Sequence, residues 1–166
     1  MANGFKALRN VGGGCQRLSE YSMADDAADM FNGDLVKLVA GELAPADPAD
    51  TNTGTFLGCM FVNAQGEQKF SPYWTASPGA TEISAVVSGD VNVSYKVETN
   101  VALVPGSAAL MVVGAGDPKT GSSAQSAIAG AGNLTVKKNL EPEMDYGTGL
   151  DTFYAEVTFN TNIGVA

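Results

Sequence analysis

The chain is cut into short apolar segments by turn-forming residues, and none of these segments keeps a helical period for long. The clearest is TFLGCMFV at 55–62, which is followed after a Gly-containing turn by a partner segment at 68–74. Residues 91–98 alternate between apolar and polar positions, and the apolar set is Val91, Val93, Tyr95 and Val97. Alternation of period two is typical of a half-buried strand. The pattern therefore predicts an all-β protein.

We expect seven to nine short antiparallel strands in one domain over residues 34–166. The clearest candidates are 34–39, 55–62, 68–74, 82–87, 91–98, 108–113, 133–140 and 152–159. Polar stretches at 42–53 and 141–149 are expected to be loops. Short strands at this spacing are typical of a small barrel or sandwich.

Residues 1–33 differ from the rest and are expected to form an extended N-terminal arm. The run Gly12-Gly13-Gly14 interrupts the arm with a flexible break. Ser22, followed by acidic residues, is a suitable cap for a short helix over about 23–31. Neither part is long enough to be stable in isolation, so the arm needs a surface on which to lie.

Charge divides the chain in the same way. The net charge is −9, but residues 1–22 carry three basic residues and one acidic residue, a net +2, so the remainder carries −11. An acidic body repels phosphate backbones, and we expect no nucleic-acid partner. Two interpretations of the arm stay open: a disordered tail, or a tether that becomes ordered on an acidic neighbouring subunit. The tether would use Phe5, Lys6, Leu8, Arg9, Arg17 and Leu18.

Catalytic chemistry finds little support in the residues. The chain has no histidine, which removes the Ser-His-Asp and Cys-His arrangements and the histidine-based zinc motifs. Each acidic cluster has a simpler interpretation, as a helix start or as a solvated loop. These clusters are Asp25, Asp26 and Asp29; Asp47 and Asp50; and Glu141, Glu143 and Asp145. We expect no catalytic residues, no metal site and no cofactor, although a hydrolase that uses carboxylates alone stays open as a third alternative.

Two further features bear on environment and partners. Cys15 and Cys59 lie in unlike surroundings and form no CxxC motif, so free thiols made in a reducing cytoplasm are expected. There is no secretory signal and no stretch of 18 apolar residues, and we expect no membrane partner. Tyr73 and Trp74 close a strand and are interpreted as core, with an exposed aromatic contact as the alternative.

Several motifs together resemble a group of small structural proteins from tailed-bacteriophage virions, the capsid decoration or cement proteins. They are FNGDLVK at 31–37, GTFLGC at 54–59, FSPYW at 70–74 and the valine run at 85–87. The resemblance covers about residues 31–97 and extends loosely to 120–123 and the last strand. That group commonly has Asp-Asp-Pro after the valine run, where this chain has Ser88-Gly89-Asp90.

The resemblance implies a non-enzymatic β-rich protein on the outside of an icosahedral head. It would be made in the host cytoplasm, bind the major capsid protein and stabilise the head, with neighbouring copies of itself as further partners of the arm. The alternative is a carbohydrate- or receptor-binding module of the virion surface, such as a head fibre or adhesin base, with Tyr73 and Trp74 as its platform.

Overall fold

A computed structural model describes residues 4–11, 13–90, 92–145 and 150–159. This part of the chain contains no helix, which confirms the expected all-β class. Its strands, in chain order, are β1 (Lys6–Asn10), β2 (Leu18–Ser22), β3 (Met30–Phe31), β4 (Leu35–Val39), β5 (Glu42–Pro45), β6 (Gly54–Val62), β7 (Gln68–Ser71), β8 (Tyr73–Trp74), β9 (Thr81–Ser88), β10 (Val93–Thr99), β11 (Ala108–Val112), β12 (Ser126–Ala129), β13 (Leu134–Asp145) and β14 (Leu150–Phe159).

The later strands close into a barrel. Its order is β10-β12-β11-β13-β14, and β14 pairs back onto β10. β1 pairs with the first residues of β10, on the side opposite β14. Of the alternating positions expected on 91–98, Val93, Tyr95 and Val97 are buried and face the interior, while Val91 lies outside the described residues. Tyr95 stacks on Phe159 of β14 with ring centroids 4.6 Å apart. A small-barrel core of this kind is filled by side chains and leaves no channel.

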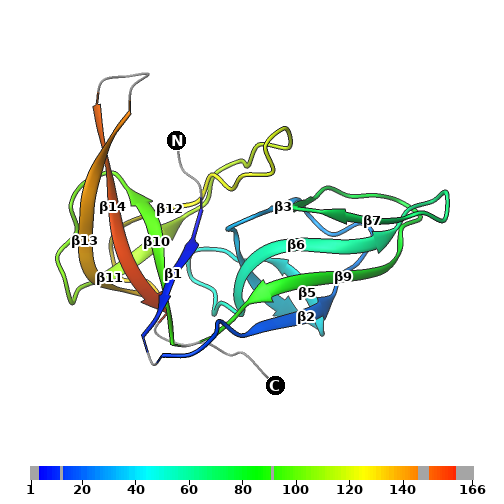
Figure 1. The fold of residues 1–166 in the computed structure, drawn as a ribbon, viewed down its shortest axis with the longest axis horizontal. Coiled ribbons are helices and arrows are strands. Elements are labelled where there is room, and N and C mark those ends of the chain that lie inside the picture. The colour runs from blue at the N-terminus through cyan, green and yellow to red at the C-terminus, as the bar shows by residue number, and fades with distance from the viewer. Residues whose placement is uncertain (1–3, 12, 91, 146–149, 160–166) are drawn as a thin grey trace.

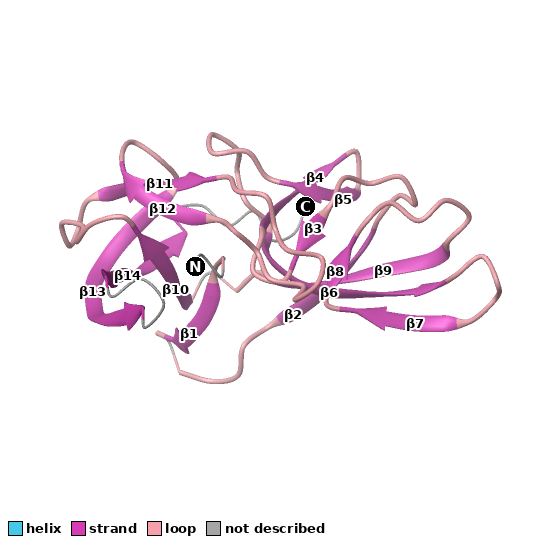
Figure 2. Ribbon diagram, turned by 90° about the horizontal axis from the view of Figure 1, so that it is seen from above, coloured by secondary structure: helices cyan, strands magenta, loops and turns pink. Residues whose placement is uncertain are grey.

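The earlier strands form a second sheet, of order β2-β9-β6-β4-β5, with β7 paired to β6. We call it the flat sheet. It lies beside the barrel in both ribbon views (Figure 1, Figure 2). Its inner face buries a separate hydrophobic cluster that includes Phe56, Cys59, Val87 and Trp74. A two-strand ribbon of β3 and β8 covers this cluster and brings Trp74 opposite Met30.

The structure corrects several expectations about individual elements. It has more strands than the seven to nine expected, and one pairing, β10 with β12 at Thr99 and Ala127, is parallel. The expected loops 42–53 and 141–149 contain β5 and the end of β13. The helix expected over 23–31 is absent, because Met30 and Phe31 are extended and pair with Trp74 and Tyr73.

The N-terminal segment is not separate from the body. β1 pairs with β10, and β2 pairs with β9, so the segment contributes one strand to each sheet. Phe5 is buried in the barrel cluster and donates its backbone N–H to the carbonyl of Gly33. Backbone hydrogen bonds satisfied within the chain are the reason that this segment is ordered without a neighbour.

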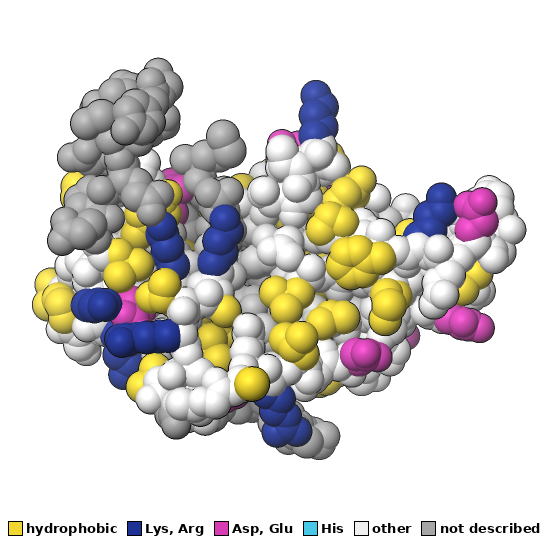
Figure 3. Space-filling view, viewed as in Figure 1, with side chains coloured by type: hydrophobic (Ala, Val, Ile, Leu, Met, Phe, Trp, Pro, Cys, Tyr) yellow, Lys and Arg dark blue, Asp and Glu magenta, His cyan; other side chains and the backbone are white. Residues whose placement is uncertain are grey.

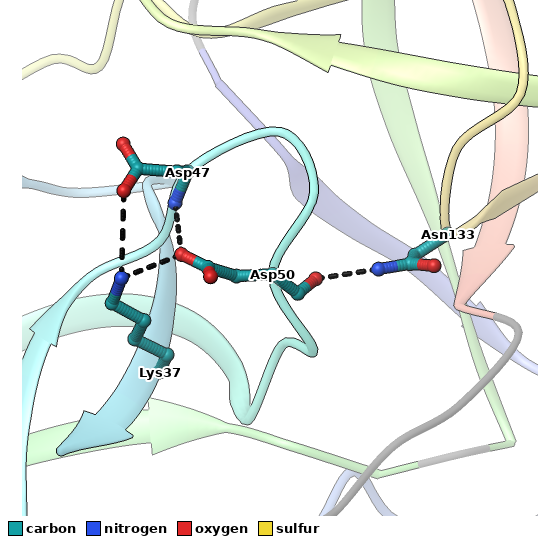
Figure 4. A network of polar contacts seen from close by, with 4 residues as sticks. All are labelled: Lys37, Asp47, Asp50 and Asn133. Atoms are coloured by element: carbon teal, nitrogen blue, oxygen red, sulfur yellow. Dashed lines mark hydrogen bonds and ion pairs between the residues drawn. The ribbon is translucent and has the colours of Figure 1, made fainter.

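Polar contacts join the flat sheet to the barrel. On β4, Lys37 lies 2.6 Å from the carboxylate of Asp50 and 3.5 Å from that of Asp47, which holds the loop after β5 in place (Figure 4). The Asn133 amide, just before β13, donates to the backbone carbonyl of Asp50. Buried Asp34 likewise accepts hydrogen bonds from the Phe31 backbone and the Ser123 hydroxyl. Of these bonds, those of Asn133 to Asp50 and of Ser123 to Asp34 connect the two bodies.

Candidate protein-binding surface

The six residues proposed for the arm divide into two groups. Phe5 is buried, and the Arg9 guanidinium is paired with Glu156 of β14 at 2.7 and 3.1 Å. Both therefore hold β1 onto the barrel. The other four, Lys6, Leu8, Arg17 and Leu18, are exposed. Lys6 and Leu8 lie on β1, Leu18 lies on β2, and Arg17 lies on the connection between the two strands.

The two aromatic residues of the FSPYW motif belong largely to the interior. Trp74 is 1% exposed, and its indole N–H donates to the carbonyl of Ala27 at 3.2 Å. Its ring meets Phe61 edge-on with centroids 5.4 Å apart. Tyr73 is half-buried and stacks on Phe31. The core interpretation of Trp74 is therefore correct, and the exposed-platform interpretation is wrong for this residue.

The outer face of the flat sheet carries an apolar surface. Met60 of β6 is directly opposite both Phe70 of β7 and Ser84 of β9, so all three point to the same side. Val86 lies two residues beyond Ser84 and shares that side, as does Leu18 of β2, which is opposite Ser88. We call Leu18, Met60, Phe70 and Val86 the apolar face.

Side chains of the apolar face are open to solvent. Phe70 is 65% exposed, Leu18 53% and Met60 36%, while Val86 is half-buried. Hydrophobic side chains gather over β6 and β9 in the space-filling view (Figure 3). Glu20, which accepts a hydrogen bond from Ser84, adds a carboxylate to the same side of the sheet. An exposed apolar group with a polar border is typical of a protein-binding site.

Gly58 explains how Phe70 reaches its position. The φ angle of Gly58 is +145°, and a Cβ atom there would lie 2.8 Å from the Ser71 carbonyl and 2.9 Å from the Phe70 ring. The Phe70 ring therefore lies directly over a bare backbone in the neighbouring strand. An aromatic ring over a strand glycine covers the exposed peptide groups and fixes the direction of the ring.

Leu18 was expected to contact a partner, whereas Met60, Phe70 and Val86 were not expected at the surface. Met60 and Val86 lie in continuous apolar runs, and such runs do not indicate which face of the strand is buried. The sequence does contain one sign of an exposed apolar residue, because Phe70 is a single aromatic between the polar residues Lys69 and Ser71. Its outward direction depends on the pairing with Met60, which the sequence does not reveal.

The acidic side chains that the structure describes are used in local contacts. No three Cys, Asp or Glu side chains among the described residues lie close enough to hold a metal ion. Asp25 uses its carboxylate to accept from the Gly79 backbone, and Asp47 and Asp50 pair with Lys37. The side chains of Glu141, Glu143 and Asp145 lie outside the described part.

The cysteines are both free, with Cys15 exposed and Cys59 buried. Burial raises the pKa of the Cys59 thiol to about 11, so it stays protonated at neutral pH. Since the described residues form no helix, they contain none that is long and apolar enough to cross a membrane. Comparison with known proteins finds no matching family model, no similar curated protein and no similar solved structure.

Proposed function

We propose that this chain is a non-enzymatic capsid decoration protein that binds the major capsid protein on the outside of a tailed-phage head. The observation that carries the proposal is the apolar face. Phe70 and Val86 both belong to motifs that resemble the decoration group, and Gly58, beneath Phe70, belongs to a third. The residues that carry the resemblance and the residues that form the exposed surface are thus partly the same.

The physical basis of head stabilisation is mass action. A protein that binds only the assembled shell lowers the free energy of that state relative to every other. Burying a side chain such as Phe70 contributes roughly 1.5–3 kcal/mol. A small contact of this kind is weak for a single pair of proteins, but it is repeated at every equivalent position of the lattice.

The N-terminal strands change how the proposed tether must be tested. Deletion of residues 1–22 would remove β1, β2 and the buried Phe5, so loss of binding would follow from unfolding alone. Point substitutions on the apolar face avoid this problem. Phe70→Ser and Met60→Ser change exposed side chains and leave the inner core of the flat sheet intact.

The experiment is co-sedimentation with empty heads of the phage that encodes the chain. We expect the Phe70→Ser/Met60→Ser double variant to lose at least about tenfold in affinity, because two buried side chains are removed from the contact. Val104→Ser is the matched control, since Val104 is 70% exposed and outside the apolar face. Absence of head binding by the unmodified chain, or equal binding by the double variant, would refute the proposal.

The carbohydrate-binding alternative loses half of its aromatic platform. It relied on Tyr73 and Trp74 as an exposed platform, and Trp74 is buried with its indole N–H already bonded. A sugar stacks on the open face of an aromatic ring. No other observation on this chain favours that function.

A further inference from the structure

A row of charged side chains crosses four strands on the outside of the barrel. Lys6 of β1 is directly opposite Lys96 of β10, and Lys96 is directly opposite Glu156 of β14. Glu156 is in turn directly opposite Lys138 of β13. Residues that are directly opposite point to the same side of a sheet. The four side chains therefore lie side by side on one outer surface.

Arg9 joins this row from the same side. It is opposite Ser94, two residues from Lys96, and its guanidinium reaches both carboxylate oxygens of Glu156. Lys138 lies 3.6 Å from the same carboxylate. We call Lys6, Arg9, Lys96 and Lys138 the basic face. Figure 3 shows it as a group of Lys and Arg side chains around an acidic one, on the barrel half.

The basic face has more positive than negative charge. Among the side chains that the structure describes, these four cations share the surface with two carboxylates, Glu156 and Glu98, which leaves a local net charge of +2 in a chain of net charge −9. Arg9 and Lys138 are more than half exposed, whereas Glu156 is fully buried beneath them. The cationic groups are therefore more accessible to solvent and to a binding partner than the Glu156 carboxylate is.

Placing like charges opposite one another costs stability. Lys6 and Lys96 face each other across β1 and β10, an arrangement that is unfavourable by a few tenths of a kcal/mol or more. The Lys96 ammonium gains some compensation from the Tyr154 ring, whose centroid is 4.0 Å away. An external anion placed over the row would be attracted to both ammonium groups.

The geometry points to an acidic polypeptide segment as the ligand of the basic face. Four neighbouring strands span only about 14 Å, which suits a few carboxylates on one extended or helical segment. A nucleic-acid duplex would place a long line of phosphates against the rest of the acidic body, where repulsion dominates. Lys6 and Arg9 were also part of the tether interpretation, but the basic face is a different surface from the apolar face, and the inference does not depend on head binding through that face.

The test is fluorescence anisotropy of the full chain with a labelled deca-glutamate peptide. We expect saturable binding that weakens as salt is raised, because the contact is between exposed charges. Lys6→Glu with Lys138→Glu is expected to lower the affinity by at least about tenfold. The matched control is Lys69→Glu with Lys119→Glu, which makes the same change in net charge at exposed lysines elsewhere.

Three results would overturn the inference. They are no binding of the peptide at low salt, an equal loss of affinity in the control pair, and tighter binding of a labelled DNA duplex than of the peptide. Lys6→Gln with Lys138→Gln is a milder second variant in case the reversed charges disturb β1. Variants of the basic face keep Phe70 and Met60, so failure here leaves the head-binding result unaffected.

Discussion

Arg9 and Glu156 are 147 positions apart in the chain and form a two-pronged ion pair, with N–O distances of 2.7 and 3.1 Å. The pair fastens β1 to the barrel, since Arg9 comes from the edge strand and Glu156 from β14, two strands away. Glu156 is fully buried, so its carboxylate depends on the partners that reach it. An ionised carboxylate without partners is costly to bury.

Arg9→Ala is therefore expected to destabilise the protein by about 1–3 kcal/mol, because a charged hydrogen-bond partner of a buried carboxylate is removed. Urea unfolding followed by circular dichroism measures the change. Arg17→Ala, at an exposed position in the same N-terminal segment, is the control and should change stability by less than about 0.5 kcal/mol. Equal midpoints for Arg9→Ala and the unmodified chain would show that the pair does not hold β1.

Glu156 also makes stability depend on pH. Burial raises the pKa of Glu156, but hydrogen bonds from Arg9 and Ser94 and the charge of Lys138 outweigh it, so the pKa lies below its ordinary value. A lowered pKa stabilises the folded state above the unfolded pKa, and this contribution disappears as pH falls through the folded pKa. Stability should therefore decline as the solution is acidified below about pH 4.3.

Glu156→Gln removes this contribution. The difference in unfolding free energy between the unmodified chain and the variant should be largest at neutral pH and should shrink as the pH falls below about 4. Urea titrations at a series of pH values measure this difference. A difference that stays constant across the series would contradict the assignment of a lowered pKa to Glu156.

Gly116 is expected to tolerate no side chain. A Cβ atom at this position would overlap the ring of Phe31, which is 6% exposed and stacked on Tyr73. Gly116→Ala should therefore cost about 1–3 kcal/mol through overpacking. Ala115→Ser, at the exposed neighbouring position, is the control for thermal unfolding. A melting temperature of Gly116→Ala equal to that of the control would contradict this packing.

The two cysteines should differ in reactivity. At pH 8 a maleimide is expected to label one thiol per folded chain, because Cys15 is exposed whereas Cys59 is buried with a pKa of about 11. In concentrated urea both thiols should react. Mass spectrometry after brief labelling counts the adducts, and Cys15→Ser identifies the fast site. Rapid double labelling of the folded chain would be inconsistent with a buried Cys59.

Local patterns predicted the strands whose faces differ in polarity. Val93, Tyr95 and Val97 alternate with polar residues, and the strand was recognised with its inward face. The end of β13 was not recognised, because Pro142 and the acidic residues around it are typical of a loop. The structure places a bulge between Leu140 and Glu143, and this irregularity lets the strand continue through the proline.

Features that depend on distant pairing could not be predicted. The helix expected over 23–31 was inferred from Ser22 and the acids that follow, but pairing of Met30 with Trp74 outweighs this local preference. The basic face is assembled by three strand pairings, β1 with β10, β10 with β14, and β14 with β13. No local sequence pattern indicates that these pairings bring Lys6 and Lys138 to the same surface. The apolar face needs the pairing of Met60 with Phe70.

The order in which the strands are synthesised has a consequence for assembly. All strands of the flat sheet have been made by Ser88, whereas the barrel closes only through β14, which ends at Phe159. β1 is synthesised first, but its partner β10 begins only at Val93. β1 therefore cannot form its native pairing until β10 has been synthesised. A chain interrupted before β14 would carry the apolar face without the basic face, and only a finished chain presents both.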